Sequence, residues 1–482
     1  MTRPAYGLLI DGAETAAADG RTFTSFDPAT GEPVADFARG GAADVDAAVA
    51  AARRAYDREW RDTTPTARGR LLLDVARRLR ADATALAAAE TRDCGKPLAQ
   101  ARADVELAAR YFEFFGGAAP ALHGEQLPVG PGVVDFTVRE PHGVCGQINA
   151  WNFPLNMASR SLAAALAAGN TAVLKTPELA PHTTALLGRI VTAAGFPPGV
   201  VNLVHGDGAE AGAALSRHPG LGLLTFTGSV GTGRAVAAAA AAAVTPCVLE
   251  LGGKSPTLVF PDADLDVAAD QLARGFVEAT GQSCDLPSLA VVHADVHDAF
   301  VARVAARAAA FSVGPGAADP DVGPLISQGQ RDRVERHVAT AVRAGATVAL
   351  GGGRPAAPGT SAGWFVEPTV LTGLGPDAAA AREEIFGPVL TVVPFTGEDE
   401  AVAIANGTGH GLAAYVWTRD LGRGVRLTRR VAAGQVYVNC FGSGDSVLTP
   451  FGGTGLSGYG REKGFEALRT YTQVKNICIS AS

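Results

Sequence analysis

A regular alternation of apolar runs and helix-forming stretches begins at Gly143 and dominates the rest of the chain. The apolar runs cover residues 143–148, 171–174, 200–204 and 223–226, and the helix-forming stretches cover residues 155–168, 181–194, 209–217 and 231–243. Strands that alternate with helices at this spacing indicate βαβ units, which form parallel sheets. A second α/β pattern starts near residues 257–260 and continues past Val425. The sequence therefore predicts two α/β domains.

The part of the chain before this alternation is mainly helical in pattern. Asp44 is placed to cap a first helix. Thr64 precedes a proline that opens a second helix, because proline at the first helical position loses no needed hydrogen bond. Apolar residues at helical spacing from Leu71 to Leu86 extend this second helix to Gly95. A third helix is expected over roughly residues 99–115.

Size and composition exclude several classes of protein. The chain has 482 residues, which corresponds to about three domains at roughly 150 residues each. Its 47% hydrophobic and 18% charged residues exclude a disordered chain. The net charge of -7 argues against a nucleic-acid partner. The most apolar segment, residues 235–244, is shorter than the ~20 residues that span a bilayer, so no membrane association is expected.

The cysteines are far apart and show neither a C-x-x-C spacing nor paired histidines nearby. They are Cys94, Cys145, Cys247, Cys284, Cys440 and Cys478. This distribution argues against a zinc site or a disulfide scaffold and favours a reducing compartment. The apolar stretch at the start of the chain is too short for a signal peptide. We therefore expect a cytoplasmic protein without a bound metal.

Several short motifs follow one another in a fixed order along the chain. They are NAWNFP at 149–154, FTGS at 226–229, ELGGK at 250–254, GQSC at 281–284, EIFGP at 384–388, PFGG at 450–453, SGYGRE at 457–462 and YTQVK at 471–475. In this order and at these intervals they resemble the NAD(P)-dependent aldehyde dehydrogenase superfamily. No single motif is specific, but the ordered set spans nearly the whole chain.

The resemblance implies a fold with two α/β domains and a small β arm. Residues 1–118 and 142–251 would form a Rossmann-like NAD-binding domain, and residues 252–455 the catalytic domain. Residues 119–141 and 456–482 would form the oligomerisation arm, in which the strand-like segments 132–140 and 470–479 combine. Family members are dimers or tetramers, so a homodimer or homotetramer is expected.

Cys284 is the candidate nucleophile. A thiolate adds to an aldehyde carbonyl to give a thiohemiacetal, which collapses by loss of hydride to a thioester. A buried structural cysteine is the ordinary alternative for any single cysteine. The surrounding G-Q-S-C motif favours the nucleophile at this position, and the other five cysteines keep the structural interpretation.

Asn152 and Glu250 are the other candidate catalytic residues. An amide N–H of Asn152, with the backbone N–H of Cys284, would stabilise the charge on the former carbonyl oxygen. Glu250 would act as the general base that deprotonates Cys284 or activates the hydrolytic water. Read alone, Asn152 is a turn residue and Glu250 a satisfied glutamate at a strand end. The resemblance favours the catalytic roles, and a retained Glu250 favours release of the free acid.

The predicted cofactor site begins at a glycine-containing turn between a strand and a helix. Gly228 and Ser229 would receive a pyrophosphate there, although the turn is not a G-x-G-x-x-G fingerprint. The further positions that match cofactor contacts of the family are Lys175, Glu178, Glu384, Phe386, Trp151 and Leu251. A carboxylate at Glu178 would accept ribose hydroxyls and repel a 2′-phosphate, which favours NAD over NADP.

The chain departs from the family pattern at Ala150, where a proline is usual, and with more consequence at two further places. Ser161 stands where many members have a lysine that helps to relay protons with the glutamate matched by Glu462. Glu462 is therefore expected to lack its cationic partner. After the nucleophile, Asp285 and Leu289 replace the commoner G-S-R ending, so the ion pair of that arginine is lost. An inward-facing Asp285 would raise the pKa of the Cys284 thiol and oppose its activation, so we expect Asp285 to face away or to pair with a cation.

The substrate pocket is expected around Arg160, Asp285 and Phe441. Arg160 would recognise an anionic or strongly polar aldehyde by charge-assisted hydrogen bonds. The alternative is a salt bridge between Arg160 and Asp285 without a role in binding.

The expected activity is oxidation of a small-molecule aldehyde to its carboxylate with NAD. The departures at Ser161, Asp285 and Leu289 leave open a non-catalytic or weakly active relative with a structural or binding role. Reduction of an activated acid is a third reading, which Glu250 disfavours because a water-activating base would waste the thioester.

Overall fold

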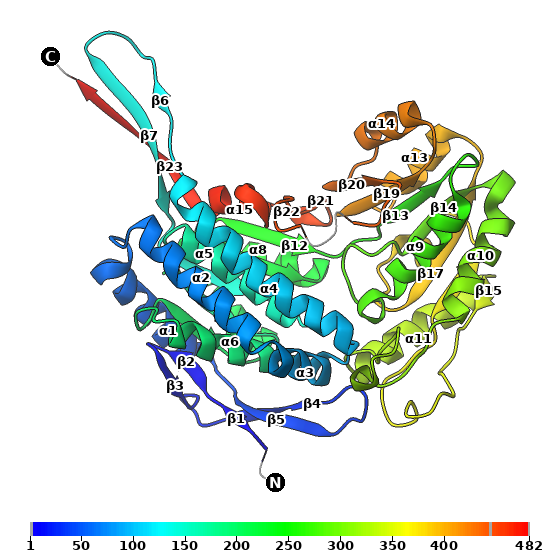
Figure 1. Cartoon of the computed structure of the whole chain (residues 1–482), viewed down its shortest axis with the longest axis horizontal. Coiled ribbons are helices and arrows are strands. Elements are labelled where there is room, and N and C mark those ends of the chain that lie inside the picture. Colours follow the sequence, from blue (N-terminus) through cyan, green and yellow to red (C-terminus); the bar gives the residue numbers. More distant parts are fainter. Residues whose placement is uncertain (1–2, 443–445, 481–482) are drawn as a thin grey trace.

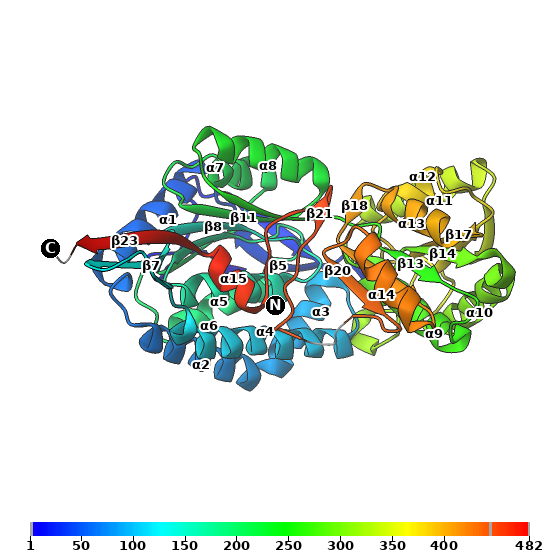
Figure 2. The ribbon, with the colours of Figure 1, turned by 90° about the horizontal axis from the view of Figure 1, so that it is seen from above.

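Two large sheets form the frame of the computed structural model, which describes residues 3–442 and 446–480. Figures 1 and 2 show that each sheet belongs to its own half of the molecule and has helices packed around it. The two α/β halves and the projecting arm confirm the predicted fold class. The domain boundaries proposed from the sequence stay a prediction.

The strands of the first sheet lie in the order β22-β12-β11-β8-β9-β10-β2-β3. Its elements are β8 (Val144–Ile148), β9 (Thr171–Lys175), β10 (Val201–Val204), β11 (Leu223–Gly228) and β12 (Cys247–Leu251), with β2 (Leu8–Ile10), β3 (Ala13–Thr15) and β22 (Gly458–Tyr459) at the edges. Strands β8 to β12 pair in parallel, as the alternation predicted, whereas the edge strands pair antiparallel. Every residue of β8, β9 and β10 is buried, as parallel strands covered on both faces require.

Helices cover both faces of this sheet. One face carries α2 (Pro65–Ala81), α3 (Ala83–Cys94), α4 (Leu98–Ala118), α5 (Pro154–Ala167) and α6 (His182–Ala193), and the other carries α1 (Ala42–Ala55), α7 (Ala213–Ser216) and α8 (Val230–Ala242). Each face has its own apolar core, with Phe112 and Leu162 in one and Val49 and Val236 in the other. Every residue of α5 is buried, which makes it the central helix of its layer.

The second predicted helix is in fact two helices, so its expected course from Thr64 to Gly95 is wrong. Thr64 caps α2 as predicted, but α2 ends at Ala81, and α3 begins after Asp82, which has a ψ of 10°. The apolar stripe continues across this break, and periodicity alone therefore does not reveal it. Aspartate disfavours the helix interior because its side chain competes for backbone hydrogen bonds.

The sequence suggested that Asp44 caps the first helix from outside, but Asp44 lies within the helix. The helix begins at Ala42, so Asp44 is its third residue. The Asp44 carboxylate accepts hydrogen bonds from the backbone N–H groups of Gly41 and Ala18, each at 2.9 Å. A carboxylate in the first turn stabilises the helix in the same way as a cap, because it satisfies an N–H group that has no helical partner.

The second sheet has the strand order β15-β16-β17-β14-β13-β19-β20. Its elements are β13 (Pro256–Val259), β14 (Leu289–His293), β16 (Thr369–Thr372), β17 (Val389–Phe395), β19 (Ala413–Trp417) and β20 (Gln435–Val438), all parallel, with β15 (Thr347–Leu350) antiparallel at one edge. The helices around it are α9 (Leu265–Val277), α10 (His297–Ala309), α11 (Gln328–Arg343), α12 (Ala379–Arg382), α13 (Glu398–Asn406) and α14 (Leu421–Arg430). This half confirms the second α/β pattern.

A β arm projects from the first half of the molecule (Figure 1). In it β7 (Val133–Pro141) pairs antiparallel along its whole length with β23 (Thr472–Ser480), and β6 (Gln126–Leu127) adds a short third strand. This confirms the predicted pairing of segments 132–140 and 470–479. Apolar side chains such as Val134 and Ile479 are exposed on the arm.

Smaller elements complete the chain. They are the sheet of β1 (Ala5–Tyr6), β4 (Thr22–Phe26) and β5 (Pro33–Ala38), the pair β18 (His410–Gly411) and β21 (Thr454–Gly455), and helix α15 (Gly464–Thr470). In the described part of the chain, no helix has both the length and the apolar character needed to cross a membrane.

The close crossing of α2 and α4 gives a prediction about stability. A Cβ atom added at Gly69 would lie 2.4 Å from the carbonyl oxygen of Gly116, so Gly69→Ala should force the helices apart and lower the thermal midpoint. Gly117→Ala is the matched control, because nothing lies within 4 Å of its added Cβ. Alanine there should stabilise α4 by up to about 1 kcal/mol. Equal midpoints for the two variants would contradict this packing.

Candidate active site

The carboxyl ends of the parallel strands in the first sheet meet the amino ends of the strands in the second. Segment 149–153 follows β8, and Gly228 and Leu251 end β11 and β12. From the other side, Cys284 precedes β14 and Glu384 precedes β17. Strands β9 and β10 lie on one side of β8, and β11 and β12 lie on the other, so the strand order reverses at β8. Open α/β sheets bind ligands at such a switch point.

The loop that carries Cys284 has a constrained backbone. Ala279 and Thr280 adopt φ angles of 47° and 58°, a left-handed conformation that costs of order 1–3 kcal/mol for each residue with a side chain. Gly281 follows with a φ of 71°, and a Cβ there would lie 2.1 Å from the carbonyl carbon of Gly387. The surrounding structure thus holds this loop in place. Cys284 is partly exposed and lines a pocket.

The electrostatic surroundings of Cys284 favour the neutral thiol in this state. Desolvation raises its pKa well above the ordinary value, and the neighbouring charge of Asp285 raises the pKa further. Asp285 accepts a hydrogen bond from the Ser283 hydroxyl at 2.8 Å, and the Tyr415 hydroxyl donates to the Asp285 carbonyl oxygen at 2.8 Å. Asp285 lines the same pocket and its charge acts on the thiol, so the expectation that it faces away is wrong.

Asn152 is buried and bonded to the loop of Cys284. Its Nδ2 donates to the carbonyl oxygen of Gln282 at 2.8 Å. A side-chain amide nitrogen carries two hydrogens, so this bond leaves one for an oxyanion beside Cys284. Trp151 packs edge-on against Phe386 at 5.3 Å between ring centroids, which joins the same segment to the second half.

Glu250 lies at the end of β12 and is almost completely buried. Neither carboxylate oxygen has a hydrogen-bond partner among the described residues. Burial raises the pKa of Glu250 well above its ordinary value, and the nearby Glu462 raises it further. A Cβ at Gly452 would lie 2.7 Å from Oε1, so only glycine leaves the carboxylate its space.

Arg160 forms an ion pair with Glu462, not with Asp285. The expectation that Glu462 lacks a cationic partner is therefore wrong. The two neighbouring residues of α5 have different partners. Ser161 Oγ donates to the Met157 carbonyl oxygen at 3.0 Å, whereas Arg160 forms the ion pair with Glu462. The alternative salt bridge between Arg160 and Asp285 is replaced by this pair.

The predicted cofactor cradle occupies the carboxyl ends of β9, β11 and β12. Lys175, the last residue of β9, donates to Glu178 at 2.5 Å. Ser229 follows Gly228 and caps α8 by accepting the N–H of Thr232 at 3.3 Å. The remaining N–H groups at the start of α8 suit an anionic group such as a pyrophosphate. Leu251 packs against Gly233 of α8, and a Cβ atom added at Gly233 would lie 2.5 Å from Leu251 Cδ2.

Glu384 and Phe386 reach the cradle from the second half. Glu384 Oε1 accepts the N–H of Gly253 at 3.1 Å, and desolvation raises its pKa to about 7. Phe386 has a φ of 62°, which is strained for an aromatic residue. Behind them, Lys254 is fully buried, and burial lowers its pKa to about 8. The cofactor roles of these residues stay predictions.

The pocket beside Cys284 has a volume of about 330 Å³. Its aromatic lining residues are Tyr111, Phe153, Tyr415, Phe441 and Phe451, and its charged ones are Asp104, Arg160, Glu278, Asp285 and Lys463. The predicted pocket residues Arg160, Asp285 and Phe441 all line it. A pocket of this kind takes a small molecule with one polar end.

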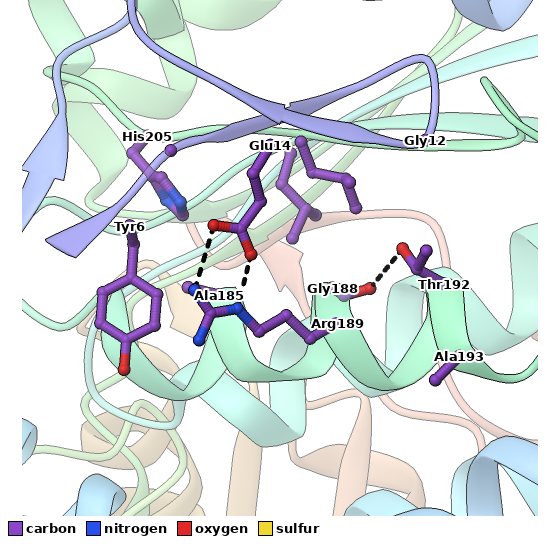
Figure 3. A pocket seen from close by; sticks show the side chains of 12 residues that line it. Tyr6, Gly12, Glu14, Ala185, Gly188, Arg189, Thr192, Ala193 and His205 are labelled. Atoms are coloured by element: carbon purple, nitrogen blue, oxygen red, sulfur yellow. Dashed lines mark hydrogen bonds and ion pairs between the residues drawn. The ribbon is translucent and has the colours of Figure 1, made fainter. Parts of the chain in front are cut away.

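A second pocket of about 240 Å³ lies between the β2–β3 hairpin and α6, where none of the predicted site residues is found. Figure 3 shows Glu14 and Arg189 paired across it, with Nε to Oε1 at 2.5 Å. Arg189 also lies over the ring of Tyr6, 4.6 Å from its centroid. These charged groups satisfy one another.

Comparison with known proteins agrees with this geometry. Residues 15–477 match the model of the aldehyde dehydrogenase family. The chain belongs to that family. This aldehyde dehydrogenase is 41% identical over 473 residues to an aldehyde dehydrogenase of Aspergillus niger, covering 98% of this chain and 94% of the relative. It is 40% identical to the betaine aldehyde dehydrogenase of Bacillus subtilis, covering 98% of this chain and 96% of that protein.

Solved structures are equally similar. The betaine aldehyde dehydrogenase of Staphylococcus aureus, in complex with NAD+, superimposes with a TM-score of 0.97 at 36% identity, covering 99% of this chain and 95% of that one. PnpE from Pseudomonas sp. WBC-3 gives a TM-score of 0.97 at 39% identity, covering 100% of this chain and 98% of that one.

Sequence reasoning missed several residues that line this aldehyde dehydrogenase's pocket. Asp104 and Tyr111 lie about two turns apart on the same face of α4, and only the position of α4 beside α5 brings them to the site. Lys463 directly follows the SGYGRE motif, and that adjacency was the available signal. The backbone carbonyl of Gln282 accepts a hydrogen bond from Asn152, and the sequence of side chains does not predict a contact made by the backbone.

The charge beside the thiol predicts how fast Cys284 reacts. Asp285→Asn should lower the thiol pKa and speed alkylation by iodoacetamide across the neutral range, because the thiolate is the reactive form. In both proteins the rate should rise with pH. Mass spectrometry of the labelled peptides measures it, and the exposed Cys440 serves as the internal control. An unchanged rate at Cys284 would show that Asp285 does not act on the thiol.

Proposed function

We propose that this aldehyde dehydrogenase oxidises an aldehyde to the carboxylic acid with NAD. The observation that carries the proposal is the bond from the Asn152 amide to the carbonyl oxygen of Gln282 in the loop of Cys284, which supports Asn152 as the oxyanion donor and Cys284 as the nucleophile. Support for the cofactor comes from the betaine aldehyde dehydrogenase of Staphylococcus aureus and from PnpE, both solved in complex with NAD.

In the proposed reaction the thiolate of Cys284 adds to the carbonyl carbon and forms a thiohemiacetal. The Asn152 amide stabilises the charge on the former carbonyl oxygen, an interaction worth about 3 kcal/mol. Loss of hydride from the same carbon gives a thioester, and NAD supplies the hydride acceptor when it is bound. Glu250 then takes a proton from the water whose oxygen attacks the thioester, and cleavage of the C–S bond releases the acid.

The cradle residues fit a dinucleotide. We assign Gly228, Ser229 and Leu251 to its pyrophosphate side, and Trp151, Glu384 and Phe386 to its nicotinamide side. Lys175 and Glu178 would contact the adenosine ribose. The 2.5 Å bond between them keeps a carboxylate at that point, which supports NAD over NADP.

The substrate proposed for the pocket is a polar or anionic aldehyde. Arg160 and Lys463 line the pocket together with Cys284, and each supplies a cationic donor. The aromatic lining leaves room for an apolar body behind the polar group.

Assembly and location belong to the same proposal. The arm offers β23 at the edge of its sheet, and a neighbouring subunit's strand can pair with such an edge, which supports a homodimer or homotetramer. All six cysteines lie in described parts of the chain as free thiols, which supports a location in the reducing cytoplasm.

Replacing the nucleophile tests the reaction. Cys284→Ala should abolish aldehyde-dependent NADH formation, measured by absorbance, because no covalent intermediate can form. NAD binding, measured by calorimetry, should stay close to that of the wild type. Cys440→Ala is the control and should retain activity. Turnover by Cys284→Ala, or a wild type that reduces no NAD with any of a broad panel of aldehydes, would refute the proposal; the latter would favour a non-catalytic relative.

The substrate class has its own test. Arg160→Ala should lower kcat/KM for a carboxylated aldehyde about 10-fold or more relative to a neutral aldehyde of the same length, since a charge-assisted hydrogen bond is worth about 1.5–3 kcal/mol. Steady-state kinetics with the two aldehydes measures this ratio. An unchanged ratio would remove Arg160 from substrate recognition.

A further inference from the structure

The charged residues that line the substrate pocket differ in whether the protein already balances their charge. Asp104 accepts a hydrogen bond from the buried Lys96 at 2.5 Å. Arg160 shares its charge with Glu462 in an ion pair. Part of the charge in this pocket is therefore balanced within the fold before any ligand enters.

Asp285 and Lys463 line the same pocket and form no ion pair within the described parts of the chain. Asp285 Oδ1 accepts a hydrogen bond from the neutral hydroxyl of Ser283 at 2.8 Å. Lys463 Nζ lies over the ring of Phe451, 4.7 Å from its centroid. A contact with an aromatic face satisfies none of the three N–H donors of an ammonium group as a hydrogen bond to oxygen would. One anion and one cation thus keep hydrogen-bonding capacity for a ligand.

The free anion and the free cation come from different segments of the chain. Asp285 directly follows Cys284, the proposed nucleophile, whereas Lys463 belongs to the C-terminal segment. Tyr415 donates to the Asp285 carbonyl oxygen at 2.8 Å, which holds the backbone of Asp285 in place. Glu278 precedes Cys284 in the chain and is a further carboxylate of the pocket lining. Negative charge therefore lies near the nucleophile, and positive charge reaches the pocket from another segment.

We propose that the substrate is a small aldehyde that carries both a carboxylate and an ammonium group. Lys463 binds the carboxylate and Asp285 binds the ammonium group, each by a charge-assisted hydrogen bond. Asp285 is the neighbour of Cys284 in the chain, so the ammonium group lies close to the carbonyl carbon that the thiolate attacks. This inference rests on the proposed function and narrows its polar or anionic aldehyde to one chemical class.

Aldehydes with a single charge fit the same lining less well. A ligand that displaces water and pairs with only one of the two groups leaves Asp285 or Lys463 desolvated without a partner. An unpaired charge in a desolvated site costs binding free energy, so the doubly charged aldehyde is preferred. The pocket volume of about 330 Å³ suits a small molecule held by a few polar groups among aromatic side chains.

Four aldehydes of similar length test the class. They are butanal, 4-oxobutanoate, 3-aminopropanal and 2-amino-4-oxobutanoate, which carry no charge, a carboxylate, an ammonium group and both groups. Steady-state kinetics of NADH formation gives kcat/KM for each one. We expect the value for 2-amino-4-oxobutanoate to exceed that of each singly charged aldehyde by about 10-fold or more, because it makes one more charge-assisted hydrogen bond.

Two variants assign each charge of the substrate to its partner. Asp285→Asn should lower kcat/KM for the two aldehydes with an ammonium group by about 10-fold relative to butanal. Lys463→Met should do the same for the two aldehydes with a carboxylate. All four aldehydes share the thiol, so the ratio to butanal removes any change in the reactivity of Cys284 from the comparison.

Matched controls separate charge from packing. Lys463→Arg keeps the charge and should retain the preference for carboxylated aldehydes. Asp298→Asn removes an exposed carboxylate of α10 and should change none of the ratios. If a pocket variant does not fold, the ranking of the four aldehydes by the wild type decides.

The outcomes distinguish this proposal from the proposed function. A wild type that oxidises 2-amino-4-oxobutanoate no better than the singly charged aldehydes would overturn the substrate class. Ratios that Asp285→Asn or Lys463→Met leaves unchanged would overturn the assignment of the two groups. A wild type that reduces NAD with none of a broad panel of aldehydes would instead overturn the proposed function.

Discussion

The arrangement of the site depends on the close approach of the two large sheets where segment 252–255 connects them. This segment leaves β12 at the carboxyl edge of the first sheet and enters β13 at the amino edge of the second. A Cβ at Gly252 would lie 2.2 Å from Glu384 Oε2, and one at Gly253 would lie 2.5 Å from the Cys284 carbonyl oxygen. Two residues without side chains therefore permit the loop of Cys284 and the side chain of Glu384 to lie close to the end of β12.

Burial at this junction has an electrostatic consequence. The thiol of Cys284 and the carboxyl of Glu250 both have pKa values raised by desolvation. Each group is therefore biased toward its protonated, unreactive form in the structure without ligands. Reactivity then depends on which charges enter or leave the site, and the fixed cation of Arg160 is the group that opposes this bias for both.

Much of the fold and part of the site could be predicted from the sequence. The strands from β8 to β12 were predictable because buried parallel strands form continuous apolar runs between helices. The break at Asp82 was not, because the apolar stripe continues through it. At the site, Cys284, Asn152 and Glu250 could be singled out because each lies in a short motif. The hydrogen bond from Asn152 to the Cys284 loop agrees with the prediction that these two motifs lie together. The pairing of Arg160 with Glu462 joins positions far apart in the chain, and only the folded path of the C-terminal segment brings them together.

The path of the C-terminal segment also has a consequence for the order in which the site can form. Strand β22 pairs with β12 beside Glu250, and Gly452, Glu462 and Lys463 complete the surroundings of that glutamate. Cys284, Asn152 and Glu250 all precede this segment in the chain. The electrostatic environment of Glu250 is therefore complete only when residues 452–463 have packed beside β12.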